Sequence, residues 1–170
     1  MKTTACNRFA RTAAVSMAAV MLAGTLCACK VQVGPSQKKQ AQAVNTGTEA
    51  EQLQLLRAAE AVAKDLDAGR YTAAWAKASP RLSKQASQEE FGNTVARMRS
   101  VAGTPGERKV AGFGFENEID GIAGRFGTIA ITTEFSRIKT GQEKFVFEHV
   151  DGKWKLAGYF VSAKVKFQSD

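Results

Sequence analysis

The feature that most constrains the fold of this 170-residue chain is a change in the spacing of its apolar residues near Gly106. Before that point, large apolar side chains recur every three or four residues, which is the period of an amphipathic helix. After it, apolar and polar residues alternate, as in a strand with one buried face. We therefore predict an α+β domain, with three N-terminal helices packed on one face of a four-stranded antiparallel sheet.

Start and stop signals predict the extents of the three helices. The first runs from Thr48 to Gly69 and the third from Ser87 to Ala102. Each begins with a hydroxyl residue followed three positions later by Glu, which is the spacing of a capping box. A shorter helix is expected from Tyr71 to Ala78, because Pro80 pushes the residue before it out of helical geometry.

The clearest β element is a hairpin from Glu143 to Val161. Its Asp151-Gly152 pair is typical of a two-residue type I′ turn, which fixes the register of the two strands. The predicted partners are Val150 with Lys153, His149 with Trp154, Glu148 with Lys155, Phe147 with Leu156, Phe145 with Gly158, and Lys144 with Tyr159. Earlier strands are expected around Phe113–Phe115 and Ile129–Phe135.

Residues 1–28 read as a secretory signal peptide of the lipoprotein type. Lys2, Arg8 and Arg11 precede a short apolar run from Ala13 to Ala23. This run is too short to span a bilayer, which needs about 20 apolar residues.

The sequence Leu26-Cys27-Ala28-Cys29 resembles the lipobox of bacterial lipoproteins. The resemblance implies cleavage between Ala28 and Cys29, a diacylglycerol on the Cys29 sulfur, and a further acyl chain such as palmitate on the new amine. Two or more chains hold a protein on a bilayer. Because Lys30 rather than Asp follows, the resemblance also implies the outer membrane, facing the periplasm, in a Gram-negative source. The alternative is ordinary cleavage after Ala28, which releases a soluble periplasmic protein.

The mature chain keeps a single cysteine, Cys29, because Cys6 and Cys27 leave with the signal. It therefore has no disulfide, and its stability must come from its core. Removing residues 1–28 takes three of the 24 basic residues and none of the 16 acidic ones, which leaves a net charge of +5. A moderate positive charge favours anionic surfaces such as lipid headgroups, whereas export and the absence of Arg-rich aromatic runs argue against nucleic acid.

Domain boundaries follow from composition. Residues 29–47 comprise the lipidated cysteine and a Gln-rich stretch with few apolar groups, which we expect to be a flexible tether. Residues 48–167 suffice for one hydrophobic core and are expected to form a single domain. Its C-terminal edge is expected to be a solvated strand carrying Lys153, Lys155, Lys164 and Lys166.

The residues predict no catalytic, metal or cofactor site. His149 is the only histidine and has no second His or Cys with which to share a metal, so we expect a structural residue beside Trp154. Four acids near loops, including a possible carboxylate pair, are best explained as solvated charges: Asp67, Glu116, Glu118 and Asp120. A weak candidate pocket is lined by aromatic residues that the core also needs: Trp75, Phe113, Phe115, Phe135, Phe147 and Trp154.

Several segments together resemble the bacterial DUF4019 family, a domain of unknown function. They are Asp67-Ala68-Gly69-Arg70-Tyr71, Ala74-Trp75, Ser79-Pro80, Phe91 to Arg99, and the closing Asp151 to Phe160. The resemblance covers about residues 51–161 and implies no activity. More loosely, the order of the elements resembles cystatin-like or NTF2-like rolls, a likeness of fold that implies no function.

These observations predict an envelope lipoprotein, held on the bilayer through acylated Cys29. Its domain is expected to be a non-enzymatic accessory module that binds a periplasmic or envelope protein without a cofactor. The alternative is a small-ligand-binding domain with an apolar cavity. A third possibility is an enzyme of the NTF2-like type, which would need at least two ionisable groups together in a cleft.

Overall fold

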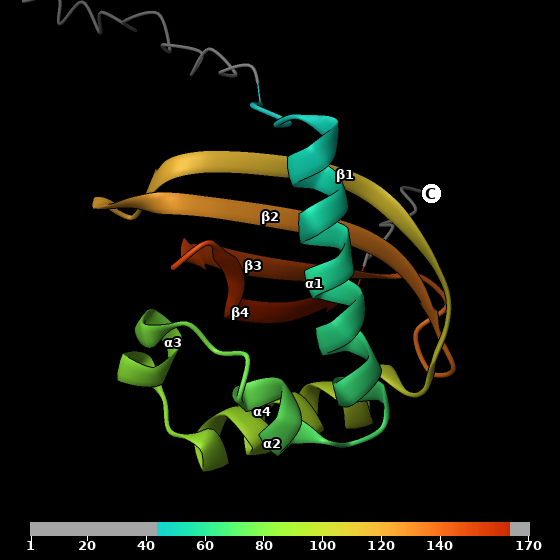
Figure 1. Ribbon diagram of the computed structural model, residues 1–170. Coiled ribbons are helices and arrows are strands. Elements are labelled where there is room, and N and C mark those ends of the chain that lie inside the picture. The colour runs from blue at the N-terminus through green and yellow to red at the C-terminus, as the bar shows by residue number, and fades with distance from the viewer. Residues whose placement is uncertain (1–43, 164–170) are drawn as a thin grey trace, which may run out of the picture. The chain divides into compact units, whose positions relative to one another are not determined.

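A computed structural model describes residues 44–163 of the chain (Figure 1). The predicted signal peptide, Cys29 and most of the predicted tether lie outside these residues, as do Lys164 and Lys166. Within the described part, no helix is long and apolar enough to cross a membrane.

Helices precede strands along the chain, and the strands form one sheet. The helices are α1 (Glu49–Asp67), α2 (Tyr71–Trp75), α3 (Pro80–Gln85) and α4 (Gln88–Ala102), and the strands are β1 (Pro105–Ile119), β2 (Ile122–Phe135), β3 (Gly141–Val150) and β4 (Lys153–Ala163). Neighbouring strands pair antiparallel in the order β1-β2-β3-β4. The predicted α+β class and four-stranded antiparallel sheet are thus confirmed.

The short helix α3 was not predicted. The predicted helix from Tyr71 to Ala78 is also too long, because α2 ends at Trp75, well before Pro80. Pro80 opens the new helix instead, since a proline in the first turn lacks only an N–H that has no helical partner there. The Ser79 hydroxyl caps this turn by accepting a hydrogen bond from the Leu82 N–H at 3.3 Å.

Both predicted capping boxes are present, at the starts of α1 and α4. In the first, Glu51 accepts a hydrogen bond from the Thr48 N–H at 2.9 Å and another from Arg125 of β2 at 2.5 Å. These two donors hold the pKa of Glu51 at about 2, so the cap stays ionised and joins α1 to the sheet.

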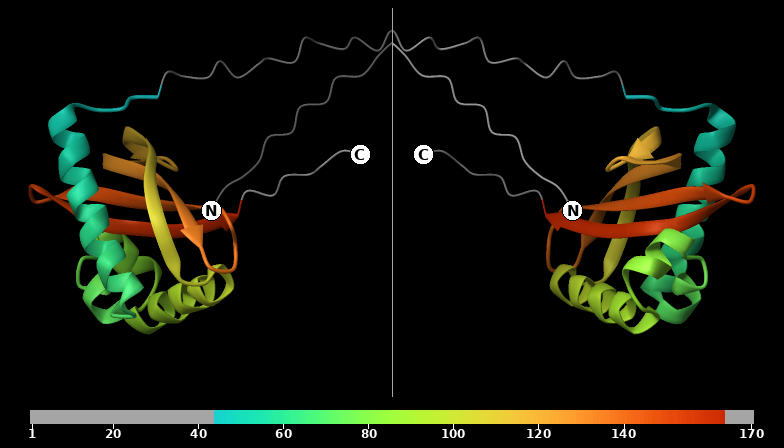
Figure 2. Two further views of the ribbon diagram at one scale, coloured as in Figure 1. Left: turned by 90° about the vertical axis from the view of Figure 1, so that its right-hand side faces the viewer. Right: turned by 90° about the vertical axis from the view of Figure 1, so that its left-hand side faces the viewer.

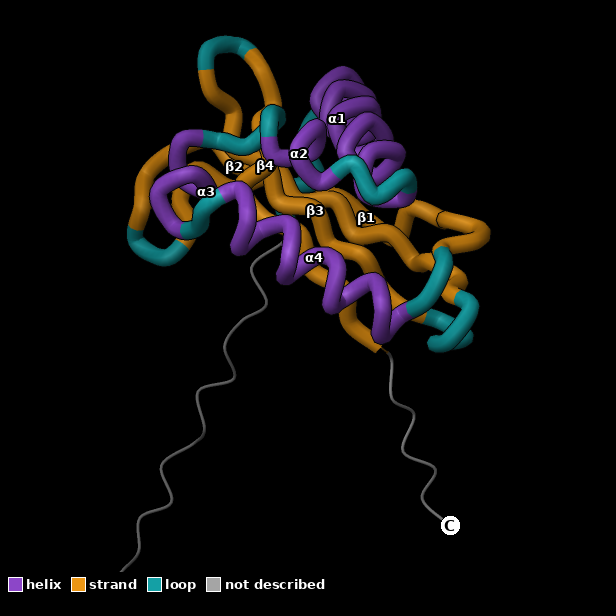
Figure 3. Tube along the Cα trace, turned by 90° about the horizontal axis from the view of Figure 1, so that it is seen from below, coloured by secondary structure: helices purple, strands orange, loops and turns teal. Residues whose placement is uncertain are grey.

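Helices α1, α2 and α4 lie on one face of the sheet, which we call the helix face. Helix α1 lies across it, and α2 packs beside α4 near the C-terminal end of α1 (Figure 2 and Figure 3). The core between these layers includes Leu55, Leu66, Val95, Phe115, Ile129, Phe145, Phe147 and Leu156. We call the opposite side of the sheet the outer face.

The β3–β4 hairpin confirms the predicted register only near its turn. Asp151 and Gly152 have φ of +51° and +75°, as a type I′ turn requires. The four predicted pairs nearest the turn are present: Val150 with Lys153, His149 with Trp154, Glu148 with Lys155, and Phe147 with Leu156.

Beyond those pairs the predicted register is wrong by one residue. Phe145 pairs with Tyr159 rather than Gly158, and Lys144 pairs with Phe160 rather than Tyr159. The cause is a β-bulge, because Val146 pairs with Gly158 and leaves Ala157 without a partner. Since side chains alternate between faces, the extra residue turns Tyr159 onto the helix face and Phe160 onto the outer face.

The edge of β4 is covered beside this bulge. The Leu156 N–H donates to the Lys77 carbonyl and the Ser79 N–H donates to the Leu156 carbonyl, both at 2.7 Å. The segment between α2 and α3 thus satisfies edge groups that would otherwise be open to pairing. It also leads α3 past the sheet edge, from where Arg81 reaches the ring of Phe126 on the outer face.

Replacing Gly103 is expected to destabilise the fold more than replacing Gly69. Both glycines have positive φ, +91° and +68°, and such backbone strain costs a substituted L-residue about 1–3 kcal/mol. A Cβ at Gly103 would also lie 2.8 Å from the Arg137 backbone nitrogen, whereas one at Gly69 meets nothing within 4 Å. Chemical denaturation should show a larger loss for Gly103→Ala than for Gly69→Ala, and equal losses would contradict the close packing at Gly103.

Candidate functional site

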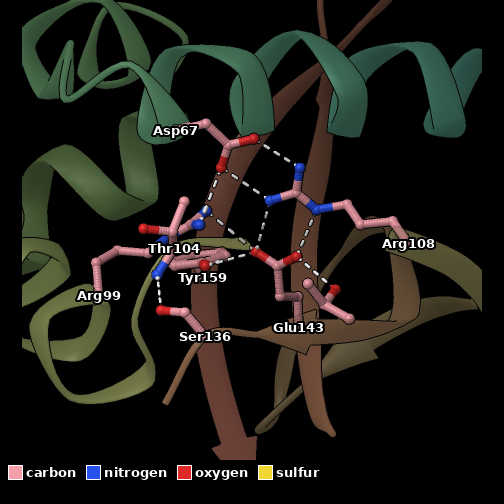
Figure 4. Close-up of polar contacts among 8 residues, drawn as sticks. Asp67, Arg99, Thr104, Arg108, Ser136, Glu143 and Tyr159 are labelled. Carbon is pink, nitrogen blue, oxygen red and sulfur yellow. Dashed lines mark hydrogen bonds and ion pairs between the residues drawn. The ribbon is translucent and has the colours of Figure 1, made fainter. Parts of the chain in front are cut away.

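Four charged side chains from different elements meet at one end of the helix face (Figure 4). They are Asp67 at the end of α1, Arg99 of α4, Arg108 of β1 and Glu143 of β3. We call them the charge cluster. Two carboxylates and two guanidinium groups make the set neutral overall.

Glu143 is the centre of the charge cluster and is fully buried. One of its carboxylate oxygens accepts hydrogen bonds from the Tyr159 hydroxyl at 2.7 Å and from Arg99 at 3.1 Å. The other accepts from Arg108 Nε at 2.6 Å and from the Thr133 hydroxyl at 2.6 Å. Both oxygens are therefore satisfied inside the protein, which is the condition for burying a carboxylate at tolerable cost.

Asp67 closes the charge cluster toward solvent. Arg108 donates to both of its carboxylate oxygens, at 2.6 and 2.8 Å, in a bidentate ion pair. Arg99 Nη1 lies 2.9 Å from Asp67 Oδ1, an ion pair without hydrogen-bond geometry. Arg99 also lies over the ring of Tyr159, with 5.4 Å between the guanidinium carbon and the ring centroid.

The environment of the charge cluster holds its acids ionised. Burial alone would raise the pKa of Glu143, but hydrogen bonds from Arg108, Thr133 and Tyr159 outweigh it and leave the pKa below the ordinary 4.5. Burial would likewise raise the pKa of Asp67, and the two arginines lower it below 3.8. Burial and the Glu143 charge raise the pKa of Tyr159, so its hydroxyl keeps its proton.

The aromatic residues predicted to line a pocket are distributed over the structure. Phe115, Phe135 and Phe147 are buried on the helix face, and Phe113 is partly buried. Trp75 packs against Phe91 instead, with ring centroids 5.5 Å apart. Phe147 and Trp154 line a shallow groove beside α1 together with Lys153 and Lys155.

The remaining predicted candidates lie at the surface. His149 is exposed, and its ring centroid lies 4.9 Å from that of Trp154. Glu116, Glu118 and Asp120 are exposed near the β1–β2 turn, and a register shift between the two glutamates interrupts their alternation. Within residues 44–163, no three His, Cys, Asp or Glu residues gather as metal ligands would.

The sequence predicts Asp67 only as a loop acid and does not indicate its partners Arg99 and Arg108, or the buried Glu143. Alternation along β3 does indicate that Glu143 is unusual. It lies two positions before Phe145 and four before Phe147, so all three side chains point to the same, buried face. A charged residue at an inward position of a strand needs a partner, and the sequence could have flagged it on that ground.

A second feature lies on the outer face. A cleft bounded by α3 and the β1–β2 turn is lined by apolar and charged side chains that we call the outer patch: Glu116, Ile122, Phe126, Lys144, Val146 and Phe160. Phe126 is buried beneath Arg81, with 5.1 Å between the guanidinium carbon and the ring centroid. Phe160 and Ile122 remain 54% and 44% exposed, and they lie together at this cleft.

Removing the Tyr159 hydroxyl is expected to destabilise the fold. The Tyr159→Phe substitution deletes one donor to a buried carboxylate, and hydrogen bonds to charged groups contribute about 1.5–3 kcal/mol. The chain's other tyrosine, Tyr71, forms no side-chain hydrogen bond within residues 44–163, so Tyr71→Phe is a matched control. Urea unfolding followed by tryptophan fluorescence measures both, and equal effects would contradict this role of Tyr159.

Stability is also expected to fall in acid. Because the folded-state pKa values of Glu143 and Asp67 lie below their ordinary values, the stabilisation is complete above pH 4.5 and is lost as the pH falls through the folded values. Glu143→Gln should remove part of this dependence and cost about 3–5 kcal/mol at neutral pH, since it leaves buried guanidinium groups unneutralised. Asp67→Asn should have a smaller effect, because Asp67 is partly exposed. Urea unfolding at several pH values measures the stability of both variants. If the stability of both variants falls with pH in parallel with that of the unsubstituted protein, Glu143 and Asp67 are not the source of the acid dependence.

Comparison with known proteins identifies the domain by family. No curated protein matches the chain. A family model described as "Protein of unknown function (DUF4019)" matches residues 58–159, more than half of the chain. The matched region begins within α1, includes all four members of the charge cluster and ends at Tyr159. The resemblance found in the sequence is therefore confirmed, and the chain belongs to the DUF4019 family.

Proposed function

We propose that this protein is an envelope lipoprotein, anchored through acylated Cys29, whose DUF4019 domain is a non-enzymatic interaction module. The anchor is supported by the basic start, the short apolar run and the Leu26-Cys27-Ala28-Cys29 sequence. We also propose that the domain is a roll of the cystatin-like or NTF2-like kind, supported by α1 lying across one face of the sheet (Figure 1).

The observation that carries the non-enzymatic proposal is the closed state of the charge cluster. A general base needs a lone pair that is free to take a proton. Both oxygens of Glu143 already accept short hydrogen bonds from arginine and hydroxyl donors, and Asp67 holds Arg108 through both of its own. Such a neutral set, in which arginines hold both carboxylates, suits a role in holding α1, α4 and the sheet together.

The interaction surface that we propose is the outer patch. Exposed apolar side chains beside charged ones mark binding surfaces more often than a uniformly polar face does. Phe160 and Ile122 are exposed here, in a cleft that α3 borders, while the long helix α1 covers the other face of the sheet (Figure 2). A protein partner is expected to cover both.

A small-ligand-binding domain is the second candidate. It is favoured by the cleft itself, where Phe126 and Val146 offer an apolar floor between α3 and the β1–β2 turn. A thermal shift with a lipid or metabolite that Val146→Glu abolishes would favour this candidate over protein binding.

Anchoring is tested by replacing Cys29. The Cys29→Ser variant should lose acyl labelling and leave the membrane fraction, because it removes the sulfur that accepts the lipid. Cys27→Ser, two residues away, is the matched control and should stay membrane-bound. Mass spectrometry showing an unmodified Cys29 in the native protein would sink the lipoprotein proposal.

Docking through the outer patch is tested by photo-crosslinking in cells. A crosslinking amino acid at Phe160 should capture envelope protein, whereas the same group at Leu53 should not. Leu53 is a matched control because it is 48% exposed but lies on α1, away from the outer face. Equal capture at the two positions, or none at Phe160, would count against the outer patch as the interaction surface.

A further inference from the structure

The strand registers order the outer patch into two ends of opposite charge. Glu116 of β1 pairs with Phe126 of β2, near the β1–β2 turn that carries Asp120 and Ile122. Lys144 of β3 pairs with Phe160 of β4, farther along the sheet. An acidic end with Ile122 therefore faces a basic end with Phe160 across the same surface.

The charges at these two ends have no partners of their own. Within residues 44–163, no ion pair or side-chain hydrogen bond involves Glu116, Asp120 or Lys144, and all three are exposed. The neighbouring Arg81 lies 3.6 Å from Glu148, so that pair is balanced and does not compensate the others. Among the residues that line the cleft, the charges without partners are thus acidic near the β1–β2 turn and basic at Lys144.

Such a surface complements itself. In a two-fold dimer each copy presents the same patch, and the symmetry exchanges its ends, so residue i of one copy contacts residue j of the other and the reverse. Facing outer patches set in this way would bring Glu116 of each copy to Lys144 of the other. The same operation brings the exposed Phe160 of each copy toward the exposed Ile122 of the other.

We propose that a second copy of this chain is the partner of the outer patch, bound as a two-fold dimer through reciprocal Glu116–Lys144 pairs and reciprocal contacts between Phe160 and Ile122. This inference rests on the proposed function, in which the outer patch is the interaction surface. Lipid anchoring would favour it further, because confining the domains near one membrane raises their effective concentration.

The decisive experiment mixes two charge-reversal variants of the mature full-length chain, each carrying Cys29→Ser so that it stays in solution. Lys144→Glu faces Glu116 with another acid, and Glu116→Lys faces Lys144 with another base. Each variant alone should therefore associate about tenfold or more weakly than the unreversed chain. In an equimolar mixture both pairs again join opposite charges, so the heterodimer should regain the original affinity. Sedimentation velocity over a concentration series measures all three samples.

Two further variants serve as a disruptive substitution and a control. Phe160→Lys should abolish association, because it places a charge where Phe160 of one copy would meet Ile122 of the other. Arg57→Glu, on the exposed side of α1, makes the same charge change as Lys144→Glu and should leave the dimer unchanged. Circular dichroism of each variant shows whether it is folded.

Three results would overturn the dimer. They are a monomer at every concentration, a dimer insensitive to Phe160→Lys, and a mixture no tighter than its separate components. If the chain is monomeric but a crosslinker at Phe160 still captures another envelope protein, self-pairing fails and the proposed function stands. If neither occurs, both fail.

Discussion

A carboxylate taken out of water must find all of its hydrogen-bond partners inside the protein, and Glu143 is such a carboxylate. Its donors come from α4, β1, β2 and β4, so one buried charge requires one helix and three strands to meet at one place. Sets of this kind often contribute less to stability than apolar packing would, while removal of one member is strongly destabilising. The charge cluster therefore mainly specifies which helices and strands pack against one another.

The bulge at Ala157 makes that meeting possible. Without the extra residue, Tyr159 would point to the outer face and Glu143 would lose the donor at 2.7 Å. The same shift brings Phe160 to the outer face, where it stands exposed beside Lys144. A single inserted residue in β4 thus completes the charge cluster on one face of the sheet and adds the exposed Phe160 to the outer patch on the other.

The two faces of the sheet consequently differ in what they can do. The helix face is occupied by α1, α4 and an aromatic core, and its charged groups neutralise one another. The outer face keeps unpaired charges and two exposed apolar side chains in a cleft beside α3. This difference supports our proposal that the outer face binds a partner.

The sequence by itself determined the features that depend on neighbouring residues: the capping boxes at Thr48 and Ser87, the Asp151-Gly152 turn, the first four pairs of its hairpin and the α+β class. Only the tertiary structure decided the bulge and the charge cluster. Arg99 and Glu143 are 44 positions apart in the sequence. Alternation along β3 shows that Glu143 points inward, but it does not show which basic side chain pairs with it. The bulge likewise arises where Leu156 bonds to the segment between α2 and α3. The spacing of apolar residues specifies a face, whereas the partner across that face depends on how distant elements pack.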